Sequence, residues 1–375
     1  MRHLTFSTAR SFGVLITAVL TLLAMTCQGQ TLQRSAQGND GLLLAKGAEA
    51  KVQIGVPAEA SANLRKTADY LAAKLNLITG AEFRIIDGGE KGIVLGHFDR
   101  FPEAHGFRPG ELTIRLSETI TVGDRESYAI RTETDRILLL GAGEPGVSHA
   151  VTRFLDQLGY RRYYPAPEWE IVPRIDPLVV KMDASDTPAI PSRGIWYAFG
   201  VPETPYMFST AERRTREYRE GDLRGRRELG EWSRQNRLGE SFHVFTSHNW
   251  ARIIRNNREA FEAHPEYYMY SEKKEQRVRR NICVSNPSVR QLAVQEAVKY
   301  FKKHPDADMY SMERGDGSVT CRCPDCRQLT ESQKVFGLAN EAARVVAQKF
   351  PGKMIGVLAY NTHDLPPDFA PPQTP

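Results

Sequence analysis

Between about residue 48 and residue 186, short apolar runs alternate with two amphipathic helical segments. In the first segment, from about Glu59 to Thr79, apolar residues recur three or four positions apart, which is typical of one buried helix face. These residues are Leu64, Ala68, Leu71, Leu75 and Ile78. A second helix is predicted from about Val147 to Leu158. The runs VQIGVP, EFRIID, GIVLG, SYAIRTE and RILLLG predict short strands. We therefore expect a small α+β domain with helices on a partly antiparallel sheet.

From about residue 190 to residue 375, predicted strands and helices alternate at the spacing of parallel βα units. The strands are GIWYAFG, SFHVFTSH, RNICVSN, ADMYSME and KMIGVLAY. Polar residues with catalytic chemistry follow the ends of these strands: His243, His248, Glu313, Asp316, Asn361, His363 and Asp364. The active face of a (β/α)8 barrel has this arrangement. The pattern therefore predicts an α/β chain whose second domain is similar to a TIM barrel.

The number of strands falls short of a closed barrel. About five predicted barrel strands precede the segment LPPDFAPPQTP, whereas a closed barrel needs eight. An open half-barrel would leave a long edge unpaired, which folded proteins avoid. We therefore expect a barrel truncated after about five strands, in a fragment, a frameshifted product or one half of an assembly.

Residues 1–29 have the features of a secretory signal peptide. A basic start is followed by an uncharged apolar run at residues 12–25 and then by small residues. Cys27 resembles the acylated cysteine of a bacterial lipoprotein, but Thr26 is a poor residue before it, so ordinary cleavage nearby is an equal alternative. The sequence predicts an exported protein, either periplasmic, extracellular or anchored to the outer membrane of a bacterium.

Composition narrows the function only slightly. The chain has 41% hydrophobic and 25% charged residues and a formal net charge of +5, part of which belongs to the signal peptide. This balance gives no indication of nucleic acid as a partner. Basic residues between Arg213 and Arg237 are interleaved with acids, as on a solvated face. The run KKEQRVRR at residues 273–280 is more one-sided and is typical of either an exposed loop or a surface that attracts an acidic substrate.

One glycine motif has the spacing of a nucleotide-binding loop but lacks its structural context. Gly141, Gly143 and Gly146 have the G-x-G-x-x-G spacing of dinucleotide-binding loops. However, the preceding strand is expected to pair with SYAIRTE as a hairpin, and no acid ends a second parallel strand at the required distance. A tight turn that leads into a helix explains the glycines, so we expect no nucleotide cofactor.

Several segments resemble known families. ITGAEF, LLLGAGEPGVSHAV and LGYRRYYP resemble the N-terminal domain shared by bacterial α-glucuronidases and β-hexosaminidases. RGIWYAFG, RQNRLGESFHVF, HPEYYMY, NICVSNPSV and MYSMERGDGSVTCRCPDC resemble the family called domain of unknown function 4838. Together the resemblances cover most of the chain after residue 29. They imply a secreted, carbohydrate-directed protein with a glycoside-hydrolase-like architecture.

Candidate catalytic residues follow from the chemistry of glycoside hydrolysis, which needs two carboxyl groups beside the scissile bond. In both enzyme families an acidic residue after the fourth strand carries catalysis, so the resemblance places the general acid at Glu313. Asp316 could orient Glu313 or raise its pKa. Asp364, after the fifth strand, is the remaining carboxylate candidate. The alternative for each residue is a surface or loop-capping acid.

Candidate substrate-binding residues lie near the same strand ends. If His243 and His248 share one strand, alternation places them on opposite faces, which argues against a joint metal site. His248, at the mouth of the strand, is the better candidate to bind a sugar hydroxyl or carboxylate. The further candidates are Asn249, Trp250, Trp196, Tyr360 and His363. Any aromatic residue among them has a core position as its alternative.

The segment TCRCPDCRQ contains three cysteines in C-x-C-x-x-C spacing, and a fourth lies near the third predicted strand. Since adjacent strands would bring them together, we expect one structural cluster of Cys283, Cys321, Cys323 and Cys326. An even cysteine count in an exported chain favours disulfides narrowly, and four thiolates around zinc are the alternative. No catalytic base is apparent beside any of them.

Two function classes remain open from sequence. The first is a glycoside hydrolase acting on a polysaccharide or a uronic-acid-containing glycan. The second is a non-catalytic glycan-binding surface lipoprotein with a degenerate or truncated barrel. In both, the expected partner is a carbohydrate, and membrane attachment would come through Cys27 alone.

Overall fold

The computed structural model describes most of the chain from residue 41 onward. The described residues are 41–108, 111–115, 121–190, 192–195, 200–201, 204–205, 215–240, 247–316 and 320–369. The predicted signal peptide and the candidates His243 and Trp196 lie outside these ranges. The described residues from Leu42 onward belong to one compact unit. Among the described helices, none combines the length and the apolar character needed to cross a membrane.

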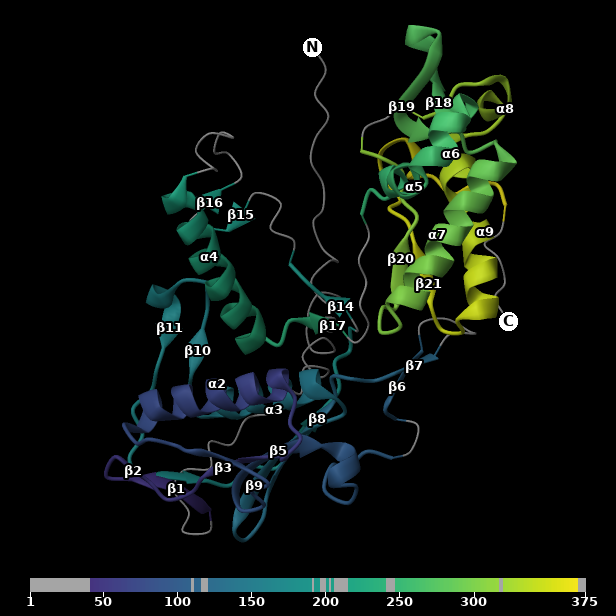
Figure 1. The fold of residues 1–375 in the computed structure, drawn as a ribbon. Coiled ribbons are helices and arrows are strands. Elements are labelled where there is room, and N and C mark those ends of the chain that lie inside the picture. Colours follow the sequence, from purple (N-terminus) through teal and green to yellow (C-terminus); the bar gives the residue numbers. More distant parts are fainter. Residues whose placement is uncertain are drawn as a thin grey trace, which may run out of the picture. The chain divides into compact units, whose positions relative to one another are not determined.

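A six-stranded mixed sheet organises the first part of this unit (Figure 1). Its strand order is β13-β8-β9-β5-β3-β4. Strands β3, β4, β5 and β9 run parallel, whereas β8 is antiparallel to both β9 and β13. The strand bounds are Ile54–Val56 (β3), Ile85–Asp87 (β4), Gly92–His97 (β5), Tyr128–Thr132 (β8), Arg136–Gly141 (β9) and Ala184–Asp186 (β13).

Two helices, α2 (Ala62–Thr79) and α3 (Glu144–Gln157), lie side by side across one face of this sheet (Figure 1). The five apolar residues predicted to share the α2 face are all buried in the core between helices and sheet. Ser61 caps α2 by accepting from the Leu64 N–H, and Gly80 ends it in the left-handed conformation. The second helix begins three residues earlier than predicted, with Pro145 in its first turn. The opposite sheet face buries a smaller apolar cluster that includes Phe98 and Leu138.

Further short strands pair in sheets of two or three. Strand β1 (Leu42–Lys46) pairs with β2 (Glu49–Ala50) and β12 (Leu178–Val180). The remaining pairs of short strands are β6–β7 (Thr113–Arg115, Thr121–Gly123), β10–β11 (Arg161–Arg162, Glu170–Ile171), β14–β17 (Ser192–Arg193, Gly239–Glu240) and β15–β16 (Gly200–Val201, Thr204–Pro205). Helix α4 (Arg216–Gln235) carries the interleaved charges, most of them exposed or half-buried.

Residues from 247 onward form a second apolar core. Strands β20 (Met309–Ser311) and β21 (Met354–Gly356) run parallel, and α7 (Pro287–Lys303) packs beside α9 (Glu331–Lys349). The remaining elements are α5 (Trp250–Asn256), α6 (Arg258–Ala263), β18 (Tyr268–Ser271), β19 (Gln276–Ile282), α8 (Pro324–Arg327) and the short helix η6 (Asn361–His363). A capping box formed by Thr330 and Gln333 fixes the start of α9.

The prediction that RNICVSN forms a parallel barrel strand was wrong. Its first residues belong to β19, which pairs antiparallel with β18 as a hairpin around Glu275 in the left-handed conformation. Residues Gln276–Arg280 are exposed or half-buried, whereas a parallel barrel strand is covered on both faces. On the side of β20 away from β21, a parallel β-bridge joins His248 to Glu313. The described residues thus contain three parallel segments at this sheet, and most of GIWYAFG and SFHVFTSH lies outside them.

Candidate functional site

The segment before α5 is fastened to the end of β20 by both backbone and side chains. The backbone N–H groups of Asn249 and Trp250 donate to the Glu313 carbonyl at 2.9 and 3.1 Å. The Asn249 side-chain amide donates to the Ser311 carbonyl at 2.7 Å, and the Trp250 indole donates to the Met312 carbonyl at 2.8 Å. These bonds fix the parallel register that brings His248 beside the residues following β20.

Glu313, Arg314 and His363 form a cluster that we call the buried trio. Each has at most 1% of its surface exposed. Glu313 Oε2 accepts from the Leu358 N–H at 2.9 Å, and His363 Nε2 lies 3.1 Å from Glu313 Oε1. The Arg314 guanidinium donates to His363 Nδ1 at 3.2 Å. Since Nδ1 accepts there, the network assigns the proton of a neutral His363 to Nε2, facing Glu313.

His248, Asp316 and Tyr360 form a second cluster, the surface trio, which faces solvent. The Tyr360 hydroxyl donates to Asp316 Oδ1 at 3.1 Å and lies 3.5 Å from His248 Nε2. His248 Nδ1 is 2.9 Å from the Arg314 carbonyl, which makes Nδ1 the donor and leaves Nε2 as an acceptor. The Asp316 side chain is 79% exposed and that of His248 is 36% exposed. The pKa of Tyr360 is raised, first by desolvation and then by the Asp316 carboxylate, so the phenol keeps its proton at neutral pH.

Glu313, the residue predicted as the general acid, is enclosed by the fold in this structure. Its carboxyl is fully buried, and a general acid must reach the oxygen that it protonates. Asp316 is instead the accessible carboxylate of the site. Asp364 is exposed one residue after His363, and within the described part of the chain it makes no hydrogen bond or ion pair.

Three of the predicted substrate-binding residues also lie in the interior. Trp250 has no exposed surface and belongs to the apolar core, and Asn249 uses its amide to hold β20. His363 is buried beside Glu313. His248 and Tyr360 remain at the surface. Arg314 was missed by the sequence analysis, since an arginine directly after a strand carries no periodic signal that separates a buried position from an exposed one.

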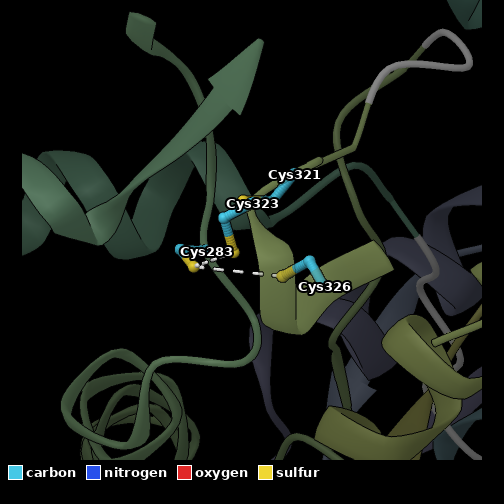
Figure 2. Close-up of side chains that lie close together, drawn as sticks. All are labelled: Cys283, Cys321, Cys323 and Cys326. Carbon is cyan, nitrogen blue, oxygen red and sulfur yellow. Dashed lines mark hydrogen bonds between the residues drawn. The ribbon is translucent and has the colours of Figure 1, made fainter. Parts of the chain in front are cut away.

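The four cysteines come together as predicted, but without disulfides. Figure 2 shows their side chains gathered between the end of β19 and the loop that leads into α8. All four are buried and free, which contradicts the narrow preference for disulfides. No catalytic partner is evident for any of them among the described residues.

The three glycines of the G-x-G-x-x-G motif serve close backbone packing. A Cβ on Gly141 would lie 2.1 Å from the Val147 nitrogen, and one on Gly146 would lie 2.3 Å from the Ser127 carbonyl oxygen. Within the loop, the Ala142 N–H donates to Ser127 and the Gly146 N–H donates to Arg125. The chain's own backbone thus occupies N–H groups that a phosphate would need. The β8–β9 hairpin expected from sequence is confirmed.

Comparison with solved structures finds glycosidases at low sequence identity. A family GH115 4-O-methyl-α-glucuronidase with specificity for decorated arabinogalactans is 14% identical, with a TM-score of 0.50, and the match covers 82% of this chain and 41% of that one. The Streptomyces plicatus N-acetyl-β-hexosaminidase is 14% identical, with a TM-score of 0.39 and coverage of 86% and 63%. The GH20 β-N-acetylhexosaminidase of Streptomyces coelicolor A3(2) is 14% identical, with a TM-score of 0.40 and coverage of 86% and 64%.

This chain spans less than two thirds of the length of each of these enzymes. At such identity the likeness concerns the fold, which is a mixed α/β fold similar to that of glycoside hydrolases. No curated protein matches the sequence. Residues 164–373, more than half of the chain, match the family described as a domain of unknown function (DUF4838). The chain therefore belongs to the DUF4838 family.

Proposed function

We propose that the protein is an exported carbohydrate-active protein, and that it acts as a glycoside hydrolase on a polysaccharide or a uronic-acid-containing glycan. The observation that carries the proposal is the surface trio. Asp316, Tyr360 and His248 come from three chain segments and meet, accessible to solvent, at the carboxyl ends of parallel strands. Barrel enzymes bind their substrates at this end of the strands.

The chemistry assigns Asp316 the role of the substrate-facing carboxyl. Tyr360 orients it through the hydroxyl hydrogen bond, and the His248 ring offers an acceptor nitrogen to a sugar hydroxyl. Hydrolysis needs a second carboxyl about 5–10 Å away, depending on the stereochemical outcome. Asp364 is the second exposed carboxylate that follows a strand of this sheet. Glu313 is a positioning residue, since its carboxyl holds His363 and the backbone after β21.

Exposed basic residues support a preference for acidic glycans. Lys273, Lys274, Arg279 and Arg280 are exposed on the β18–β19 hairpin, where their charges create a positive local potential. A uronic acid carboxylate would be attracted to such a surface. The attraction should weaken with ionic strength, because exposed charges are screened over about 10 Å at 0.1 M salt.

One observation favours the second candidate function, a non-catalytic glycan-binding protein. Glu313, the carboxylate that follows β20, is fully buried, and its Oε2 accepts from the Leu358 N–H of the same fold. A site with a single accessible carboxyl in direct contact with Tyr360 and His248 suits binding as well as catalysis. In this case a lipid anchor at Cys27 would hold the protein at the cell surface.

The two functions are separated by measuring binding and hydrolysis on the same oligosaccharides. Neutral, N-acetylated and uronic-acid-containing substrates are incubated with the wild-type chain, and released sugars are quantified while calorimetry measures binding. Asp316→Asn should lower hydrolysis by about 100-fold or more, since general acid–base groups contribute at least that much. The matched control is Asp306→Asn, an exposed aspartate before β20, which should behave as the wild type.

Hydrolysis that is unchanged in Asp316→Asn would contradict the assignment of this carboxyl. Binding without hydrolysis by the wild type would favour the binding protein over the enzyme. A wild-type chain that neither binds nor cleaves any member of the panel would contradict both functions.

A further inference from the structure

We propose that Cys283, Cys321, Cys323 and Cys326 bind one structural Zn²⁺ ion through four thiolates. Their sulfur atoms all lie within 4.8 Å of one another. Cys283 Sγ is 3.7 Å from Cys323 Sγ and 3.9 Å from Cys326 Sγ, the two contacts drawn in Figure 2. Tetrahedral zinc with Zn–S bonds of about 2.3 Å separates its sulfurs by about 3.8 Å, so the observed spacing suits the ion.

This spacing also argues against two disulfides. A disulfide brings two sulfurs to about 2.05 Å and leaves each with one sulfur partner. Here Cys283 has two sulfur neighbours at nearly equal distances, and the four atoms share one small volume. One ion at the centre satisfies all four sulfurs at once.

Burial and neighbouring donors fit a closed metal site. None of the four side chains exposes more than 3% of its surface, so no open position for substrate is apparent, as in structural zinc sites. Four thiolates around Zn²⁺ carry a net charge of −2, which needs nearby donors. The Tyr270 N–H donates to Cys321 Sγ at 3.2 Å, and the Arg277 guanidinium lies 3.8 Å from the same sulfur. The Ser285 hydroxyl lies 3.1 Å from Cys326 Sγ.

The chain brings its ligands from two places. Cys283 directly follows β19. Of the other three, Cys321 precedes α8, Cys323 is its N-cap and Cys326 lies within it. Cys283 is 38 residues before Cys321 and 43 residues before Cys326. The ion would fasten the β18–β19 hairpin to the connection between β20 and α9. Fixing segments so distant in sequence is how a structural metal adds to folding stability.

The same ion would hold the loop that carries Asp316, since Cys321 follows Asp316 by five residues. The metal site does not depend on the proposed function, because metal content and thiols are measured without any carbohydrate. Loss of zinc should nevertheless affect the surface trio through the position of this loop.

The test begins with the wild-type full chain, produced with zinc in the medium. Elemental analysis should find about one zinc per chain, and thiol titration under denaturing conditions with a chelator should find the four cluster thiols free. The folded protein, treated with a strong chelator, should unfold at a lower temperature. Added Zn²⁺ should restore the original transition and Mg²⁺ should not, because thiolates select soft metals.

Two variants separate loss of a ligand from damage to the core. Cys326→Ser should lower the zinc content by at least fivefold. Val289→Ala removes methyl groups from a fully buried residue of the same core and should lower the melting temperature while keeping one zinc per chain. If Cys326→Ser fails to fold, the wild-type metal and thiol measurements decide the question.

Three results would overturn the proposal. Four free thiols in zinc-loaded protein without bound metal would remove the site. Loss of the cluster thiols without metal would show disulfides. Bound iron with visible absorption in place of zinc would show that the four sulfurs select a different ion.

Discussion

The region of the six-stranded sheet, residues 42–186, and the region of the candidate site, residues 247–369, are stabilised by different means. In the first, β5 and β9 pair over six consecutive residues, and apolar side chains cover both sheet faces. In the second, β20 and β21 have three residues each, and the adjacent segment relies on the Asn249 and Trp250 side chains for its attachment. Apolar patterning decides the first arrangement, whereas in the second individual polar atoms and sulfurs add to an apolar core.

The largest effect is expected from truncating the apolar core of the sheet. Leu139 on β9 has no exposed surface, and Leu139→Ala should lower the free energy of unfolding by about 2–5 kcal/mol. Val179, which is 41% exposed on β12, is the matched control, and Val179→Ala should change this free energy by about 0.5 kcal/mol or less. Denaturant unfolding followed by circular dichroism measures both. Equal losses would mean that this region does not depend on its core as we infer.

Glycine substitutions test whether backbone packing, rather than a ligand, accounts for the G-x-G-x-x-G motif. Gly141→Ala places a Cβ against backbone atoms and should destabilise the protein by about 1–3 kcal/mol. Gly123→Ala, at a site with no atom within 4 Å of the added Cβ, should be nearly neutral. Denaturant unfolding followed by circular dichroism measures both variants, and the wild type is also measured with NAD added. Stabilisation of the wild type by NAD would contradict the packing interpretation.

A substitution in the buried trio tests whether polar contacts stabilise the region of the candidate site. Glu313→Gln keeps the shape of the side chain and removes the charge that faces His363, so unfolding should become easier by about 1.5–3 kcal/mol. Glu266→Gln, at an exposed glutamate, should change stability by about 0.5 kcal/mol or less. A calorimetric melting curve of each variant checks this. A neutral Glu313→Gln would show that the buried carboxylate does not hold this part of the fold.

The smallest effect concerns Glu331 and should depend on pH. Burial alone would raise the pKa of Glu331, but hydrogen bonds from Lys334 and Thr320 outweigh it and lower the pKa below its usual 4.5. The ionised carboxylate therefore stabilises the fold fully above about pH 4.5, and this contribution is lost as the pH falls through the lowered pKa.

Glu331→Gln should accordingly cost about 1 kcal/mol at pH 7 and less below pH 4.5. Urea unfolding of wild type and variant at matched pH values gives the difference, in which effects common to both chains cancel. A difference that grows as the pH falls would have the wrong sign and would reject the assignment of Lys334 and Thr320 as the stabilising partners.

The sequence predicted the elements whose residues carry a repeating signal. The apolar face of α2 follows from residues such as Leu71 and Leu75, and the β8–β9 hairpin follows from two strong strand patterns. The β18–β19 hairpin was missed because most of β19 is charged, and the apolar residues Ile282, Cys283 and Val284 at and after its end were interpreted as a parallel strand. The local sequence pattern does not determine which strand a given strand pairs with, because pairing depends on tertiary context.

At the candidate site, the sequence indicated which loops carry the candidate residues, but not which of their side chains are buried and which are exposed. Glu313 and Asp316 are three residues apart, yet one is fully buried and the other is 79% exposed. His363 and the Leu358 backbone, which both come from a later part of the chain, contact the Glu313 carboxyl, whereas Asp316 faces solvent. The cysteine cluster was predictable because the sequence places Cys283 and the other three cysteines near neighbouring strands. Choosing between disulfides and a metal ion required the distances between the sulfur atoms.

The attachment of Trp250 to β20 also bears on the order in which the chain folds. The bond from its indole to the Met312 carbonyl joins residues 62 positions apart. Closing so long a loop costs conformational entropy before the contact returns any stabilisation, so such contacts form late unless an intervening unit has already shortened the loop. The β18–β19 hairpin and α7 lie between these two residues and can form from local contacts. We therefore expect refolding to proceed from this hairpin and helix outward, with Trp250 reaching its final environment in the slowest phase of indole fluorescence.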